Sequence, residues 1–190
     1  MKRTLVLTVI LSQLPILMFA HGSHGSGFIA GFTHPILGLD HSLAIIGIGT
    51  SSYFMDSKRW YLYPLSFLIM MVIGGVLGID QEASLIIEKV IALSVIVIGM
   101  VHLKKAGSGS FLLIVIMAIF GFFHGYAHGV EMHEMTTVLK YVSGFSVGTV
   151  LLSVSGFLLS KKFESSSNSE IYSKVLAGFL MGAGFVFLWP

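Results

Sequence analysis

Residues 110–134 read SFLLIVIMAIFGFFHGYAHGVEMHE. The first half of this stretch is apolar enough to lie in a lipid bilayer, but three histidines and two glutamates follow it directly. Ionisable side chains are costly inside a membrane, so they usually face the interior of a helix bundle or a water-filled path. The stretch therefore predicts a transmembrane helix that carries a functional polar cluster at one end.

The rest of the chain is similarly apolar. Of its 190 residues, 55% are hydrophobic and 11% are charged, and the mean hydropathy is +0.90, whereas soluble domains carry about 25% charged residues. We therefore expect an all-α polytopic membrane protein. The net charge of +2 comes without a long basic tract, which gives no reason to expect a nucleic-acid partner. Because the chain has no cysteine, disulfides and thiolate metal sites are excluded.

Residues 1–20 have the layout of a signal peptide. Lys2 and Arg3 form a basic start, an apolar run follows, and Ala20 stands just before the expected cleavage point. This pattern predicts a cleavable signal peptide over 1–20 and a membrane domain over 21–190. An uncleaved first transmembrane helix is the alternative interpretation of the same residues.

Six apolar segments follow, and each is close to the ~20 residues that a bilayer span needs. They cover roughly 35–54, 61–79, 83–103, 110–129, 137–159 and 174–189. Several segments carry glycines at four-residue spacing, which permits close helix packing in lipid. These glycines are Gly74 and Gly78, Gly144 and Gly148, Gly178 and Gly182, and Gly121, Gly125 and Gly129. We therefore expect a compact six-helix transmembrane bundle.

The connections between the segments differ in charge. Nine of the eleven basic residues follow the signal segment, and seven of these lie in alternate connections: Lys58, Arg59, Lys104, Lys105, Lys161, Lys162 and Lys174. Cytoplasmic loops are enriched in lysine and arginine. The pattern predicts that the mature N-terminus and the C-terminus both lie outside the cytoplasm.

The first span opens on the polar run THPILGLDHSL, residues 33–43. Proline suits the first turn of a helix and disfavours helical backbone at the preceding residue, so we expect the helix to begin at Pro35 and His34 to lie in a loop. Asp40 and His41 then lie one to two turns inside the helix. Along a continuous helix His34 and His41 would be ~10 Å apart. They could share one ion only if the chain bends back at Pro35; otherwise each residue joins another helix.

The fourth span holds the second polar run. His124 and His128 are four residues apart, which places them on one helix face, and Glu131 extends that face by three residues. Two imidazoles and a carboxylate suit a borderline divalent cation such as Ni, Co or Zn. The predicted topology puts both polar runs in the outer half of the membrane. We therefore expect them to form one shared site.

The other histidines give weaker signals. His21 and His24 follow the expected cleavage point in a glycine-rich tail, and His133 lies in an outer loop. His102 is next to basic residues and is expected at the membrane interface on the cytoplasmic side.

The two polar runs also resemble the signatures of a known family. HPILGLDH at 34–41 resembles the HPxxGxDH signature of the HupE/UreJ family, and FHGYAHGVE at 123–131 resembles its second signature, FHGxAHGxE. Members are regarded as secondary permeases for nickel, in some cases cobalt, with an indirect link to hydrogenase or urease maturation. The resemblance implies six metal-associated residues: His34, Asp40, His41, His124, His128 and Glu131.

The expected function is a metal-ion permease and not an enzyme. Ni²⁺ or Co²⁺ would be the transported ion, no prosthetic group is expected, and the chain has no GxxxxGK[ST] phosphate loop that would bind ATP. The alternative is an intramembrane zinc hydrolase, in which an open coordination position activates water. Ser42 or Glu131 could take part in that reaction.

Overall fold

The computed structural model describes residues 27–82, 84–104, 109–130, 138–164 and 169–189. Within these ranges the chain forms seven helices and no strand, which confirms the all-α class. The helices are α2 Phe28–Leu37, α3 Leu39–Met55, α4 Leu62–Gly78, α5 Leu85–Val101, α6 Phe111–Val130, α7 Val138–Glu164 and α8 Ser169–Leu188. The signal peptide predicted over 1–20 lies outside the described residues.

Helices α6, α7 and α8 are each long and apolar enough to cross a membrane, and the pair α2 and α3 adds a fourth candidate if it counts as one span. These helices make the chain a membrane protein. Helices α4 and α5 have 17 residues each, or ~25 Å, slightly less than a hydrocarbon core of ~30 Å. Each of the six predicted segments overlaps at least one helix, but the count of six crossings and the side of each terminus stay predictions.

The first predicted span is not one straight helix. Helices α2 and α3 meet at Gly38, which has extended backbone, and their axes differ by 79°. Helix α2 starts seven residues before Pro35 and continues through it, so the expected helix start at Pro35 and the loop position of His34 are both wrong. Pro35 is buried, and a Cβ on Gly148 of α7 would lie 3.0 Å from the Pro35 ring. This packing against α7 overrides the local preference of the proline.

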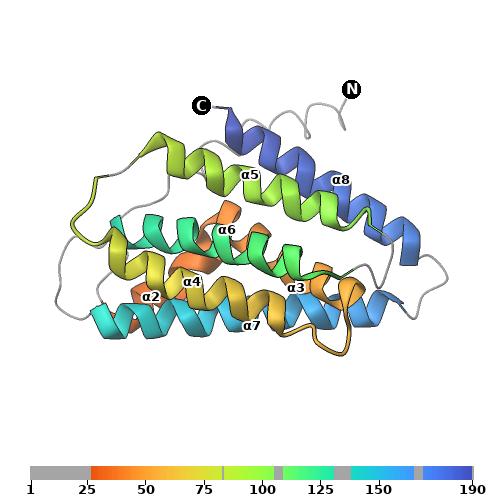
Figure 1. Cartoon of the computed structure of the whole chain (residues 1–190), viewed down its shortest axis with the longest axis horizontal. Coiled ribbons are helices and arrows are strands. Elements are labelled where there is room, and N and C mark those ends of the chain that lie inside the picture. The colour runs from red at the N-terminus through yellow and green to blue at the C-terminus, as the bar shows by residue number, and fades with distance from the viewer. Residues whose placement is uncertain (1–26, 83, 105–108, 131–137, 165–168, 190) are drawn as a thin grey trace, which may run out of the picture.

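Helices α4 and α6 lie side by side in the middle of the bundle (Figure 1). Gly121, Gly125 and Gly129 of α6 all face backbone carbonyl groups of α4, so a Cβ on any of them would overlap an oxygen. The predicted close packing of these glycines is confirmed. Gly178 and Gly182 differ, because a Cβ at either position would meet nothing within 4 Å among the described residues.

The remaining helices cover two sides of this pair. Helix α7 packs along α2 and α3, while α8 packs along α5 at the opposite edge (Figure 1). Gly31 of α2 and Gly49 of α3 approach the backbone of α7 closely. The bend between α2 and α3 is thereby fixed against α7 on one side and faces α6 on the other. The described polar residues of the two sequence runs that meet at this junction are His34, Asp40, His41, His124 and His128.

Candidate metal centre

Four histidines converge at the bend. The ring centroids of His34 and His128 are 4.5 Å apart, those of His41 and His128 are 4.6 Å apart, and those of His41 and His124 are 5.0 Å apart. His41, His124 and His128 are buried, and His34 is partly exposed. Residues separated by about ninety positions in the sequence are thus brought to one place.

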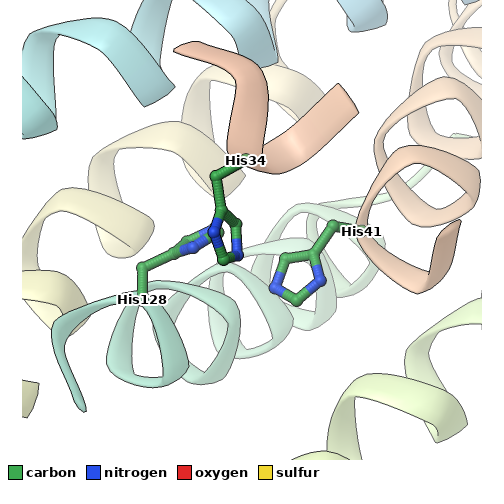
Figure 2. A group of neighbouring side chains, drawn as sticks. All are labelled: His34, His41 and His128. Carbon is green, nitrogen blue, oxygen red and sulfur yellow. The ribbon is translucent and has the colours of Figure 1, made fainter. Parts of the chain in front are cut away.

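Three of these histidines have the geometry of a ligand set. His34, His41 and His128 each offer a ring nitrogen, and these three atoms lie within 4.8 Å of one another. They come from α2, α3 and α6, and their rings point toward a common space (Figure 2). Imidazole suits nickel, zinc and copper, and geometry determines which ion is selected. The three nitrogens could bind one divalent transition-metal ion.

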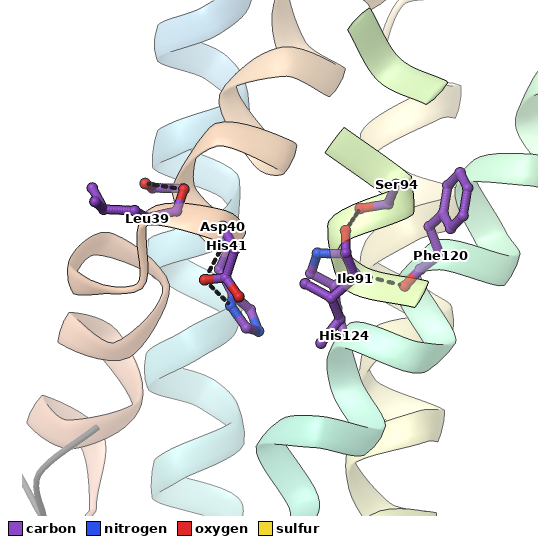
Figure 3. A network of polar contacts seen from close by, with 8 residues as sticks. Leu39, Asp40, His41, Ile91, Ser94, Phe120 and His124 are labelled. Atoms are coloured by element: carbon purple, nitrogen blue, oxygen red, sulfur yellow. Dashed lines mark hydrogen bonds and ion pairs between the residues drawn. The ribbon is translucent and has the colours of Figure 1, made fainter. Parts of the chain in front are cut away.

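Asp40 does not belong to that three-nitrogen set. Its Oδ1 accepts a hydrogen bond from His41 Nδ1 at 2.9 Å and another from the His41 backbone N–H at 2.9 Å (Figure 3). A carboxylate can only accept, so Nδ1 of His41 carries the proton and Nε2 presents its lone pair. A carboxylate behind a metal-binding histidine fixes the tautomer and raises the basicity of the ligand nitrogen. Asp40 is therefore placed to orient His41.

His124 is oriented by its own helix. Its Nδ1 donates to the Phe120 carbonyl at 2.9 Å (Figure 3), which leaves Nε2 with a lone pair. Nε2 is buried and has no hydrogen-bond partner within the described ranges. Buried polar atoms are seldom left without a partner. This nitrogen is therefore placed to coordinate a metal ion.

Aromatic side chains enclose the four histidines. Phe145 of α7 stacks on His128 with centroids 5.3 Å apart, and Phe67 of α4 contacts His124 at 5.1 Å. Both phenylalanines are at most 1% exposed. Neither residue could be identified from the sequence, because each lies on a different helix in an ordinary apolar run. The cluster is thus a polar site with apolar walls.

Gly38 lies directly beside the pair of Asp40 and His41. A Cβ at this position would be 3.3 Å from Asp40 Oδ1 and 3.3 Å from His41 Nδ1. Its φ of −71° is open to any residue, so the nearness of these two side-chain atoms, and not backbone freedom, favours glycine here.

Five of the six residues implied by the family signatures lie in the described ranges: His34, Asp40, His41, His124 and His128. All five gather at the bend, and their role in metal binding stays a prediction. Glu131 lies outside the described residues, as do His21, His24 and His133. His102 caps the end of α5 and is buried, with Thr50 Oγ1 2.8 Å from Nε2 and Ser51 Oγ 3.0 Å from Nδ1; the sequence did not indicate this burial, and its position at the membrane interface stays a prediction.

A sequence profile described as HupE / UreJ protein matches residues 9–187 of this chain. The chain belongs to the HupE/UreJ family. It is also 35% identical over 173 residues to Protein HupE of Rhizobium leguminosarum bv. viciae, which covers 90% of each chain. No solved structure matches it. The match spans both signature runs of this HupE/UreJ protein, and these are the runs that meet at the bend.

Proposed function

We propose that this HupE/UreJ protein carries a divalent transition-metal ion, nickel or cobalt, across the cytoplasmic membrane of a bacterium without ATP. One observation supports this proposal most strongly: ring nitrogens of His34, His41 and His128 lie within 4.8 Å of one another although they come from three helices. Family membership supports it independently.

The ion first binds to these three histidines from the outer side. His34 is the only one of the three that is partly exposed as a residue, and its Nε2 is itself buried, so we assign His34 the outermost position in the ligand set. His41, held by Asp40, and His128 then complete the ligand set. Glu131, which follows His128 on the same helical face in the sequence, adds a carboxylate at the outer end.

The second step is a transfer from His128 to His124. These residues are one turn apart on α6, and His41 lies near both, with ring centroids at 4.6 Å and 5.0 Å. Because His41 can stay bound while the ion exchanges one α6 histidine for the next, the ion moves inward without losing all its ligands. Two positive charges gain ~4.6 kcal/mol from a membrane potential of 100 mV, at ~2.3 kcal/mol per charge.

A zinc hydrolase has less support. The Ser42 hydroxyl donates its proton to the Leu39 carbonyl of the same helix at 3.2 Å. Ser42 is therefore already hydrogen-bonded within α3. The other candidate, Glu131, would then be both base and ligand.

Uptake of radioactive ⁶³Ni by a bacterium deficient in nickel transport tests the proposal. Cells that express the wild-type chain should accumulate nickel, His128→Ala and His41→Ala should abolish uptake, and His24→Ala in the tail should leave it unchanged. Competition by excess Co²⁺ and Zn²⁺ identifies the preferred ion. Failure of the wild type to take up Ni²⁺ or Co²⁺, or normal uptake by both site variants, would contradict the proposal.

A reporter fused after Pro190 tests the predicted outer position of the C-terminus.

A further inference from the structure

Close backbone packing divides the described helices into three units. Glycines bring α4 and α6 into backbone contact, and Gly31 and Gly49 do the same between α2, α3 and α7. At the opposite edge, a Cβ on Gly184 of α8 would lie 2.9 Å from the Ala92 carbonyl oxygen of α5. Helices packed this closely leave no room for side chains between them, so we expect each unit to move as one body. The first unit is α2, α3 and α7, the second is α4 and α6, and the third is α5 and α8 (Figure 1).

The histidine cluster lies between the first and second units. His34 and His41 belong to the first unit, while His124 and His128 belong to the second. An ion bound to this cluster therefore joins two separate bodies. A relative movement of the two units would change the ligand geometry around the ion.

Apolar side chains close the bundle beyond the cluster, toward the end of α3 that is predicted to face the cytoplasm. We call it the inner end of α3. Here Ile48 and Met55 of α3 surround a void of about 10 Å³ together with Val101 of α5 and Met117 of α6. An ion can leave inward only if the first unit moves away from its neighbours at this end.

The His102 ring joins the first unit to the third at the inner end of α3. Its Nε2 lies 2.8 Å from Thr50 Oγ1, and its Nδ1 lies 3.0 Å from Ser51 Oγ. The two sides of this contact are also tied within their own units. The Ser160 hydroxyl of α7 donates to the Thr50 carbonyl at 3.1 Å, and the Ser173 hydroxyl of α8 donates to the His102 carbonyl at 2.9 Å. One buried ring thus connects four helices.

This contact can open without leaving polar groups unpaired. His102 Nδ1 lies 3.0 Å from the Ile98 carbonyl, which can only accept, so Nδ1 carries the proton and Nε2 accepts from Thr50. Thr50 Oγ1 also lies 2.9 Å from the Gly47 carbonyl of its own helix, and the Ser51 hydroxyl donates to that carbonyl at 2.7 Å. When α3 and α5 separate, both hydroxyls keep the Gly47 carbonyl and Nδ1 keeps Ile98. Only Nε2 exchanges its partner for water, so the net cost of opening is modest.

The geometry points to His102 as a reversible latch. Its ring holds the inner end of the first unit to the third unit while the ion occupies the histidine cluster, and its opening lets the ion leave inward. This role in ion release rests on the proposed function. Thr50 follows His41 by nine residues on α3, or ~14 Å along the axis. A tilt of the first unit that opens the latch therefore also moves His41 relative to the histidines of α6.

Distances between spin labels test the latch in the purified full chain. Because the chain has no cysteine, two introduced cysteines would be the only labelled sites. Lys161→Cys on α7 and Val175→Cys on α8 report the separation of the first and third units, and both positions are exposed. Ile29→Cys on α2 with Lys161→Cys is the control pair, since both residues belong to the first unit. Double electron–electron resonance measures both pairs without metal.

The latch variant is Thr50→Val with Ser51→Ala, which removes both hydroxyl partners of the His102 ring. The matched control is Ser52→Ala with Ser94→Ala. These two serines are also buried, but their hydroxyls donate to carbonyls of their own helices at 2.7 Å and 2.6 Å. Thr50→Ser keeps a hydroxyl and should behave like the wild type. If the latch variant does not fold, Thr50→Val alone tests the same contact.

We expect the latch variant to raise the ratio of long to short Lys161–Val175 distances about fivefold, the factor for loss of a typical hydrogen bond. The Ile29–Lys161 distance should stay unchanged, and the serine control should match the wild type. In the ⁶³Ni uptake assay, the maximal rate of the latch variant should rise about twofold or more, because inward opening is no longer held back. Its KM should stay within about twofold, since the four histidines are intact.

Two results would overturn the latch while the proposed function stands. One is a latch variant whose Lys161–Val175 distances match those of the serine control. The other is a shift to longer distances with an unchanged uptake rate, which would show that the movement has no part in ion release. If the wild type takes up neither Ni²⁺ nor Co²⁺, the proposed function fails, and the role of His102 in ion release fails with it.

Discussion

The Nδ1 atom of His41 donates to Oδ1 of Asp40 at 2.9 Å, and the two residues are adjacent in the sequence. This contact makes Asp40 a positioning residue for the proposed site and not one of its three nitrogen ligands. Removal of such a partner typically costs 10–100-fold in metal affinity. We expect Asp40→Ala to raise the KM for ⁶³Ni uptake by about this factor, while Asp40→Asn, whose amide oxygen can still accept from Nδ1, has a smaller effect. If Asp40→Ala abolishes binding as fully as His128→Ala does, Asp40 binds the ion directly.

Gly38 gives a separate test of the same contact. A methyl group there would press on both Asp40 Oδ1 and His41 Nδ1 at 3.3 Å. Because the backbone at Gly38 is accessible to alanine, Gly38→Ala should leave thermal stability close to that of the wild type and weaken nickel affinity several-fold. Thermal unfolding in detergent and the KM for uptake distinguish these effects. A large loss of stability with unchanged KM would show that Gly38 serves the bend alone.

Helix packing makes opposite predictions for two glycines. A Cβ on Gly125 would overlap the Met71 carbonyl oxygen, whereas a Cβ on Gly178 would have open space. Overpacking typically costs about 1–3 kcal/mol, so Gly125→Ala should lower the Tm in detergent by several degrees. Gly178→Ala should keep or slightly raise the Tm, because alanine favours a helix over glycine by ~1 kcal/mol. Equal Tm values for the two variants would contradict the packing of α4 against α6.

His102 is expected to stabilise the fold without binding the ion in the outer cluster. Its ring lies between Thr50, Ser51 and the Ile98 carbonyl, and its backbone carbonyl accepts from the Ser173 hydroxyl at 2.9 Å. The loss of these buried hydrogen bonds in His102→Ala should cost about 1–3 kcal/mol and lower the Tm. The KM for nickel should stay close to that of the wild type. A KM as strongly raised as in Asp40→Ala, with normal Tm, would instead place His102 among the ligands.

The all-α class and the approach of the two histidine runs to one shared site could both be predicted from the sequence. These predictions rest on residue spacing along a helix and on the charges of the connecting loops. The spacing of His124 and His128 fixes them on one face of α6, and the charge pattern predicts that His34 and His41 lie at the same depth as that pair. The structure brings these four side chains together. Their role in binding metal stays a prediction.

What the sequence missed depends on contacts between distant residues. Local preferences around Pro35 predicted a helix start, but burial of its ring against α7 lets α2 continue to Leu37. The burial of His102 was missed because its hydroxyl partners lie about fifty residues earlier in the chain. Phe67 and Phe145 were missed because apolar runs do not show which of their members face a polar site.

The 79° bend at Gly38 also has an electrostatic consequence. A helix carries about half a positive charge at its N-terminus and half a negative charge at its C-terminus. The bend places both kinds of helix end in the bundle: Asp40 lies in the first turn of α3, where the positive end stabilises its carboxylate, and His34 lies in the last turn of α2, where the negative end favours a cation. A single unbroken helix would have offered neither of these partial charges at the histidines.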